Sequence, residues 1–378
     1  MTPELTATPA LLIDAGRLER NLARVTNYAA CHGLAWRPHV KTHKSAWVAA
    51  RQMAHGAIGL TAATPHEAEV MATVTDDVLL AYPPIGAGRL DRIGRLATRC
   101  RLGVMLDSSE SAEYLSRTMI DHATTARVLV EVDAGMRRTG TADVASAVAL
   151  AERIAVLPGL AFEGFGFYPG HLRSAGSESD APLDELSGLV GCLRAAAEAA
   201  GLEVRTISAG STPLLWRSHE IAGITELRAG TAAYFDRTSV AGGVCRLDEC
   251  AATILATVVS TAVPGQAIVD AGVKALGREP IRGSEADGFA CIIDRPEVLV
   301  TRLSEEHGTL DLSRTNWQPR VGDQVRLLPN HACVAVHNFD AMTVAHPDGS
   351  IEERPVEARG RGRPAGAPGE RGAAEPRG

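Results

Sequence analysis

The sequence predicts a two-part protein of the α/β class, and three observations support this prediction. Between about residues 10 and 235, short apolar or β-branched runs alternate with longer alanine-rich stretches of helical character. After about residue 240, short apolar runs are separated instead by turns rich in Gly, Pro, Asp and Asn. The chain has 378 residues, enough for one large domain and one smaller domain. Strands that alternate with helices predict parallel βαβ units, and about eight such units over ~230 residues predict a TIM-type (β/α)8 barrel.

The first part of the chain, residues 8–238, contains the predicted barrel. Its strand-like runs are Ala10–Ile13, Leu34–Val40, Ile58–Thr61, Val78–Ala81, Gly103–Leu106, Ala126–Val132, Leu160–Phe167 and Glu203–Ser208. The helical stretches between them include Asp14–Cys31, Pro65–Thr73, Ser108–His122, Ala142–Leu157 and Leu183–Ala200. Several helices begin with a capping residue followed by an acid three positions later, as Thr64 is followed by Glu67. A doubly wound open sheet is the alternative, but no Gly-x-Gly-x-x-Gly follows the first strand to support it.

The second part, residues 239–358, contains no long helical period and is predicted to be an antiparallel β-domain. Residues 359–378 are rich in Gly, Pro, Arg, Ala and Glu without an apolar period, and this composition predicts a disordered tail. The predicted strands of the β-domain are Ala251–Ala262, Gln266–Val269, Gly288–Ile293, Thr309–Leu312, Gln324–Leu328 and Val334–Val336.

Composition and charge exclude several classes of function. Hydrophobic residues make up 45% of the chain and charged residues 22%, as in ordinary soluble globular proteins. The net charge is −7 and the folded part has no long basic run, so we expect no nucleic-acid partner. No apolar stretch approaches the ~20 residues that span a bilayer, and no signal peptide precedes the first strand, so we expect no membrane partner and a cytoplasmic protein. The seven cysteines are odd in number and scattered, which argues against a disulfide framework and fits a reducing compartment.

A basic segment at the end of a predicted strand supplies the first candidate for catalysis. Residues 37–44 read RPHVKTHK. In a (β/α)8 barrel, side chains at the carboxyl ends of the strands face the active site. Desolvation and the neighbouring cations would lower the pKa of Lys41 and favour a neutral amine able to form a Schiff base. A solvated basic loop is the alternative interpretation.

Two turns of small residues are candidates for a phosphate site. Residues 208–213 read SAGSTP and residues 228–231 read RAGT, and each turn follows a strand-like run. Glycine lets the backbone approach a ligand closely, while hydroxyl and amide groups can hold a phosphate. In TIM-type barrels this site often follows the seventh and eighth strands, where these turns fall. Two ordinary βα turns are the alternative; the candidate residues are Gly210, Ser211, Thr212, Gly230 and Thr231.

Two further segments could complete a cofactor site at the mouth of the barrel. Residues 131–140, EVDAGMRRTG, offer an arginine that could hold a pyridine nitrogen or a phenolic oxygen, although Arg137 or Arg138 could equally form a surface ion pair. In FYPGH, Tyr168 and His171 could lie over a cofactor face, or Tyr168 could simply pack in a loop.

The predicted β-domain contains one candidate metal site. His331 and Cys333 are two residues apart, so on an extended segment both side chains point the same way. An imidazole and a thiolate together suit a soft divalent metal such as zinc. A pair with only a structural role is the alternative.

Taken together, these segments resemble the alanine-racemase-type (fold type III) pyridoxal 5′-phosphate enzymes, and most closely their D-serine dehydratase and D-threonine aldolase branch. The resemblance extends from Thr8 to about Gly360. Its most specific parts are residues 37–44, Gly210–Pro213, Glu305–Gly308 and Pro329–Cys333.

The resemblance implies a homodimer with each site near the subunit boundary, and a role for each candidate residue. Lys41 would carry pyridoxal phosphate, the two small-residue turns would bind its phosphate, and Arg138 and Tyr168 would lie beside the ring. Lys41, Tyr168 and His171 are the catalytic candidates. His331 and Cys333 match the metal pair of this branch; zinc is expected, with manganese or magnesium as alternatives.

The resemblance leaves two reactions of β-hydroxy D-amino acids open. In the dehydration, Lys41 removes the α-proton, and a metal on His331 and Cys333 turns the β-hydroxyl into a better leaving group, which gives a 2-oxo acid and ammonia. In the retro-aldol cleavage, His171 or a histidine near Lys41 takes the hydroxyl proton, which gives glycine and an aldehyde. Within the branch, dehydratases carry His-x-Cys and aldolases His-x-Asp at the metal position, so Cys333 favours dehydration.

Two further functions are disfavoured. A racemase of this type uses a tyrosine from the β-domain of the partner subunit as the second base, and no tyrosine occurs in this chain after Tyr234. A pyridoxal-phosphate carrier protein is a single barrel, and the second part of this chain argues against it.

Overall fold

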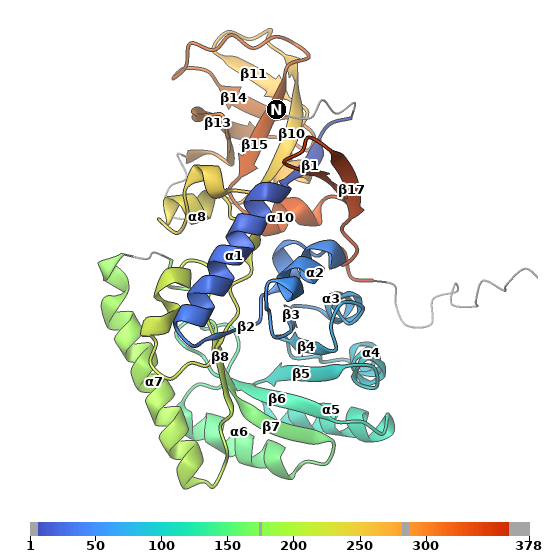
Figure 1. Ribbon diagram of the computed structural model, residues 1–378, viewed down its shortest axis with the longest axis vertical. Helices are drawn as coiled ribbons and strands as arrows, with labels where there is room; N and C mark the ends of the chain where they lie inside the picture. Colours follow the sequence, from blue (N-terminus) through green and yellow to red (C-terminus); the bar gives the residue numbers. More distant parts are fainter. Residues whose placement is uncertain (1–6, 174–175, 282–286, 363–378) are drawn as a thin grey trace, which may run out of the picture.

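The computed structural model describes residues 7–173, 176–281 and 287–362, and these form two sheets (Figure 1). One sheet is parallel and lies at one end of the molecule, and the other is mostly antiparallel and lies at the opposite end. The prediction of an α/β barrel followed by a β-domain is confirmed. Most of the predicted tail, residues 363–378, lies outside the described part of the chain.

Eight parallel strands form the barrel. The two ends of this sheet, β2 and β3, are joined by a bridge between His39 and Thr61, where the Thr61 amide donates to the Pro38 carbonyl at 2.9 Å. In sheet order the strands are β2 (Ala35–Trp36), β9 (Glu226–Leu227), β8 (Thr206–Ala209), β7 (Leu160–Gly166), β6 (Ala126–Glu131), β5 (Arg101–Leu106), β4 (Asp77–Leu80) and β3 (Leu60–Ala62).

Helices cover the outside of the barrel and bury apolar residues against it. Thr64 caps α3 by accepting a hydrogen bond from the Glu67 amide, as the capping pattern predicts. No helix in the described ranges combines the length and the apolar character needed to cross a membrane. The helices of this part are α1 (Ala15–Cys31), α2 (Ala46–Ala54), α3 (Pro65–Met71), α4 (Ala87–Ala97), α5 (Ser109–Asp121), α6 (Val144–Val156), α7 (Asp180–Ala199) and α8 (Arg237–Ala241).

The second sheet has nine strands, and a pairing of β10 with β11 curls six of them into a small barrel. Its short helices are α9 (Val273–Leu276) and α10 (Ala332–His337). In sheet order the strands are β11 (Gln266–Val269), β14 (Gly308–Asp311), β13 (Arg295–Leu303), β12 (Ala290–Ile292), β15 (Gln324–Pro329), β10 (Ala252–Ser260), β1 (Ala10–Asp14), β16 (Ala341–Ala345) and β17 (Ile351–Pro355).

The structure places the first strand differently from the sequence analysis. The run Ala10–Ile13 was predicted as the first barrel strand, but β1 pairs antiparallel with β10 and parallel with β16 in the second sheet. Leu11 and Ile13 are buried there together with Ile254 and Val344. The eighth barrel strand is instead β9, a two-residue strand.

A second difference concerns the segment after His331. The run Val334–Val336 was predicted as a strand, but it lies within α10. Valine-rich runs this short do not distinguish strand from helix by pattern. The helix is stabilised at its start, where the Ala332 amide donates to Asp236 at 3.1 Å. This helix contacts η1 (Val40–Thr42), the short 3-10 turn that carries Lys41.

Candidate active site

A cavity of about 580 Å³ lies at the carboxyl ends of the barrel strands and reaches the β-domain. The loops after β2, β7, β8 and β9 contribute to its wall, as do residues 279–281 and His331. Of the predicted site residues, His171 and Cys333 do not line it; those that do are Lys41, Arg138, Tyr168, Gly210, Ser211, Thr212, Gly230, Thr231 and His331.

Lys41 and Tyr168 face each other across the cavity. Lys41 lies in η1, directly after β2, and its amide donates to Nδ1 of His39 at 3.4 Å. Its Nζ lies 5.4 Å from the centre of the Tyr168 ring, and the guanidinium carbon of Arg138 lies 5.3 Å from the same centre. The phenol ring therefore lies within range of two cations, as favourable cation–π contacts require.

The other basic residues of segment 37–44 point in different directions. Lys44 forms a buried ion pair with Glu67, so its charge is neutralised away from the cavity. His43 is buried and accepts a hydrogen bond from the Ser45 amide on Nδ1, while Nε2 lies 3.1 Å from Gln52 Oε1. Burial lowers the pKa of His43 to about 4. Of the cationic candidates in this segment, His39 and Lys41 line the cavity.

The electrostatics around Lys41 disfavour a further positive charge. Burial, together with the charges of Lys41 and Arg228, holds the pKa of His39 well below its ordinary value. His39 is therefore a neutral imidazole at pH 7.

The two small-residue turns form a cradle that fits a phosphate. Gly210 has φ +104°, a conformation that disfavours other residues, and a Cβ on Gly230 would lie 2.0 Å from the His39 carbonyl oxygen. Ser211 Oγ is buried and has no hydrogen-bond partner among the described residues. A buried hydroxyl without a hydrogen-bond partner lowers the stability of the protein, so this oxygen is available to bind a polar ligand. The cradle passes this test for the phosphate of pyridoxal phosphate.

Arg228 also lines the cavity, although the sequence analysis gave it no role. It is buried, and it donates to Ser208 Oγ at 2.6 Å and to the Phe167 carbonyl at 2.8 Å. Burial lowers its pKa, although Glu226 and Glu131 oppose the shift. The sequence contains one indication that Arg228 lies near Glu226. The two residues are two positions apart along a strand-like run, so their side chains lie on the same face.

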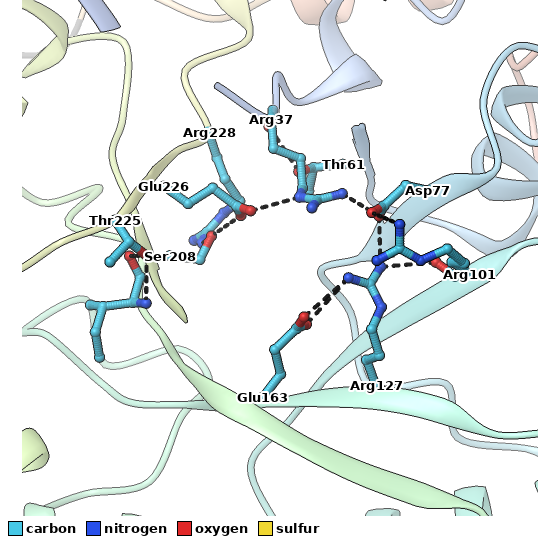
Figure 2. A network of polar contacts seen from close by, with 11 residues as sticks. Arg37, Thr61, Asp77, Arg101, Arg127, Glu163, Ser208, Thr225, Glu226 and Arg228 are labelled. Carbon is cyan, nitrogen blue, oxygen red and sulfur yellow. Dashed lines mark hydrogen bonds and ion pairs between the residues drawn. The ribbon is translucent and has the colours of Figure 1, made fainter. Parts of the chain in front are cut away.

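Arg228 is one end of a polar network inside the barrel (Figure 2). Glu226 accepts from Ser208 and from Arg37, whose Nε lies 2.8 Å away. Arg37 also pairs with Asp77, and this carboxylate pairs in turn with Arg127. The network then ends at Glu163 and Arg101, at the amino-terminal end of the barrel.

The ion pairs of this network fill space that aliphatic layers fill in other barrels. Beside them, Leu79, Met105 and Leu129 form a small apolar cluster.

The structure brings His331 and Cys333 together in a way that differs from the predicted extended segment. His331 is the N-cap residue of α10, and Cys333 lies in its first turn. The two side chains interact electrostatically, and Cys333 Sγ lies 3.2 Å from Thr42 Oγ1, next to Lys41. An imidazole and a thiol side by side are a suitable donor set for a soft divalent metal. Within the described ranges, no three His, Cys, Asp or Glu side chains cluster tightly enough to bind a metal alone.

The thiol of this pair is poised to ionise. Burial opposes ionisation of Cys333, but the hydrogen bond and charge of His331, together with Lys41, lower its pKa below the ordinary value. Partial burial in turn opposes protonation of His331, but the contacts with Cys333, Asp236 and Glu279 raise its pKa to about 10. A thiolate is the form that binds metal.

His171 is exposed and lies outside the cavity lining. Its ring packs over Gly135, where a Cβ would lie 2.9 Å from it.

Comparison with known proteins places both parts of the chain. Residues 13–238 match the family model of the alanine racemase N-terminal domain, and residues 251–345 match that of a putative serine dehydratase domain. These two matches divide the chain near the change from barrel to β-domain.

Similar proteins cover nearly the whole chain. D-threo-3-hydroxyaspartate dehydratase of Delftia sp. (strain HT23) is 34% identical, over 91% of this chain and 96% of that protein. The crystal structure of D-threonine aldolase from Filomicrobium marinum has a TM-score of 0.87 at 31% identity, over 94% of this chain and 96% of that one. A mutant of D-threo-3-hydroxyaspartate dehydratase in a metal-free form has a TM-score of 0.81 at 31% identity, over 94% of this chain and 98% of that one.

Proposed function

Because the chain belongs to the alanine-racemase-type (fold type III) family of pyridoxal-phosphate enzymes, in its D-serine dehydratase and D-threonine aldolase branch, we propose that it is a metal-dependent lyase of β-hydroxy D-amino acids. The proposed reaction is dehydration of substrates of the D-serine or D-threonine type to a 2-oxo acid and ammonia. The dehydratase relative, 34% identical to this chain, supports this reaction.

One observation carries the proposal. A single cavity is lined by Lys41, by the glycine turns of the barrel and by His331 of the β-domain. An amine, a phosphate cradle and a soft metal donor pair are the groups that this dehydration needs, and they come from three distant parts of the sequence. Neither domain alone contains all of them.

The residues of the cavity, together with Cys333, can hold both groups that the reaction requires. Gly210, Ser211, Thr212, Gly230 and Thr231 would hold the phosphate, and Arg138 and Arg228 would provide cations for the ring oxygen and nitrogen. His331 and Cys333 would hold the metal, for which zinc is proposed. When bound, pyridoxal phosphate supplies an electron sink for charge that develops at the substrate Cα, and the metal supplies a Lewis acid for the β-hydroxyl.

The side chains of this protein then have separate tasks. Lys41 Nζ takes the α-proton, and its position against the Tyr168 ring directs the amine into the cavity. His39 stays neutral beside it and so does not add a positive charge to the wall. Arg138, whose guanidinium carbon lies 5.3 Å from the centre of the Tyr168 ring, can hold an anionic group such as a carboxylate.

Retro-aldol cleavage to glycine and an aldehyde is the second candidate, because the D-threonine aldolase structure resembles this chain over nearly its whole length. In that reaction a base removes the proton of the β-hydroxyl. His171 lies outside the cavity lining, so the neutral His39 is the histidine in position for this step. The thiol of Cys333 at the metal pair favours dehydration over this alternative.

We propose in addition that the enzyme works as a homodimer with each cavity near the subunit boundary, as its family resemblance implies. Residues 279–281 of the β-domain form part of the cavity wall.

The test is to incubate the purified, cofactor-loaded protein with D-serine and D-threonine, with and without a chelator. We expect pyruvate or 2-oxobutyrate that the chelator suppresses. Glycine and acetaldehyde would establish the aldolase instead. The Lys41→Ala variant should lose turnover together with the long-wavelength absorbance of the bound cofactor; full absorbance in this variant would contradict the role of Lys41.

A further inference from the structure

The ring of His331 has two nitrogens, and one of them contacts a neighbouring carboxylate. Nδ1 contacts a carboxylate oxygen of Glu279 and forms an ion pair with it when the ring is protonated. The form of the ring that binds a metal is neutral, and a neutral imidazole that donates Nδ1–H to a carboxylate keeps its lone pair on Nε2. Nε2 is therefore the nitrogen left for a metal beside Cys333.

We propose that Glu279 is a positioning residue for the metal site: its carboxylate fixes the tautomer and the ring orientation of His331. This inference rests on the proposed metal site and adds a third residue to it, from a different loop. Glu279 lines the same cavity, and it acts through His331 rather than on the substrate.

The ring needs such a partner because packing does not hold it. The side chains of His331 and Glu279 are 39% and 49% exposed, so neither is confined by close contacts on all sides. An exposed imidazole without a hydrogen-bond partner would sample several rotamers and both tautomers. Holding the ring in one orientation removes this entropy before the metal binds.

Hydrogen bonds to the backbone around the pair hold Glu279 close to His331. Asn330, which directly precedes His331, is 1% exposed. Its side-chain amide donates to the Glu279 carbonyl at 3.0 Å and to the Gly288 carbonyl at 2.8 Å, and its own oxygen accepts from Arg237 at 3.1 Å. One buried side chain therefore ties the Glu279 loop to the residue next to the metal ligand.

The other side of His331 is fixed as well. Thr238 Oγ1 donates to the Asn330 carbonyl at 2.7 Å, and the Ala332 amide donates to Asp236. Because the backbone is fixed on both sides of His331, the freedom that remains lies in its side-chain torsions. Glu279 is the group that restricts them.

The experiment measures metal affinity directly in the full-length, cofactor-loaded protein after removal of metal. Cobalt(II) titration follows the thiolate-to-metal absorption of Cys333, and competition with a chromophoric chelator gives the zinc Kd. Partners that orient metal-binding histidines are worth about 10- to 100-fold in affinity, so Glu279→Ala should raise the zinc Kd by about that factor. Glu279→Gln, whose amide oxygen can still accept from Nδ1–H, should stay within about 3-fold of wild type.

Glu297→Ala provides the matched control, because Glu297 is an exposed glutamate of β13 in the same domain. Unchanged cofactor absorbance in the variants shows that the cavity is still folded. A zinc Kd for Glu279→Ala within 2-fold of wild type overturns the proposal. Equal losses in the Gln and Ala variants also overturn it, because they would make Glu279 a direct ligand.

A failure of the proposed function would give different metal-binding results from a failure of the positioning role. If wild type binds no zinc or cobalt, or binds it equally well in the His331→Ala variant, the metal site itself is wrong and Glu279 has no role in it. If His331→Ala abolishes binding and Glu279→Ala does not change it, the metal site stands and only the positioning role fails.

Discussion

At the scale of single residues, Ser211 Oγ in the cavity wall is a buried polar atom without a hydrogen-bond partner among the described residues. Such a group costs stability in the empty protein and contributes it when a ligand is bound. This arrangement predicts opposite effects of one substitution on the two states.

We expect Ser211→Ala to weaken cofactor binding while leaving the cofactor-free protein as stable as wild type or more stable. Loss of one hydrogen bond to a charged phosphate should raise the pyridoxal-phosphate Kd by roughly 10-fold or more. Absorbance titration and thermal unfolding without cofactor measure the two effects.

Thr26→Val is the matched control, because Thr26 Oγ1 is also buried without a partner in the described part of the chain but lies on α1, outside the cavity lining. It should change stability without changing the Kd. A lower cofactor-free stability in Ser211→Ala, with an unchanged Kd, would contradict the phosphate role of Ser211.

At the scale of elements, the short turn η1 is held in place by the residues around Lys41 rather than by its own length. His43 follows η1 and is buried as a neutral ring, with its Nδ1 accepting from the Ser45 amide. Its pKa of about 4 lies below the ordinary value of 6.5 because burial disfavours the charged form. This shift makes the segment sensitive to acid.

Between pH 6.5 and 4, the unfolded chain binds a proton at His43 that the folded chain does not bind. The stability supplied by the neutral ring is complete above pH 6.5 and is lost as the pH falls through this window. The loss reaches roughly 3 kcal/mol for a shift of this size. Thermal unfolding of wild type and His43→Asn at several pH values should show a flatter profile for the variant.

His32→Asn, which changes an exposed histidine at the end of α1, should keep the wild-type profile. Parallel profiles for wild type and His43→Asn would contradict the assignment of acid sensitivity to His43.

At the scale of the whole molecule, the polar network of Figure 2 links the two ends of the barrel. It begins at the exposed Arg101 and ends at the buried Arg228 in the cavity wall. Glu226 is its central acid, since it accepts from Ser208 on one side and Arg37 on the other. Removing a single buried charge leaves its cationic partner without compensation.

Glu226→Gln should therefore lower the free energy of unfolding by about 3 kcal/mol or more, which urea denaturation can measure. Glu203→Gln breaks an exposed pair with Arg205 and should leave the free energy of unfolding nearly unchanged, because solvent screens the pair. Equal effects of the two substitutions would show that the network does not hold the barrel together.

The sequence predicts much of this architecture because the chemistry lies in contiguous segments. Lys41, the glycine turns and the His331–Cys333 pair each occur within a few residues, so local pattern is enough to find them. Arg228 with Glu226, and Glu279 with His331, were not predicted. Glu279 and His331 are 52 positions apart, so only the folded chain brings them together.

The local sequence pattern also gives wrong predictions where it cannot show which sheet a strand joins. Ala10–Ile13 has the composition of a barrel strand, yet its partner is decided by residues about 240 positions later. The run Val334–Val336 reads as a strand, and the hydrogen bond from Ala332 to Asp236 favours a helix instead.

The position of β1 has a consequence for how this protein can be divided. The chain starts in the β-domain, passes through the whole barrel and then returns, so the barrel is an insertion within the other domain. A single cut near residue 240 would produce a β-domain without one of its inner strands and a barrel fragment with an orphaned strand. Shortening the amino terminus through Asp14 would therefore damage the distant half of the molecule first. A circular permutant that begins at α1 and carries β1 at its far end would make each domain continuous.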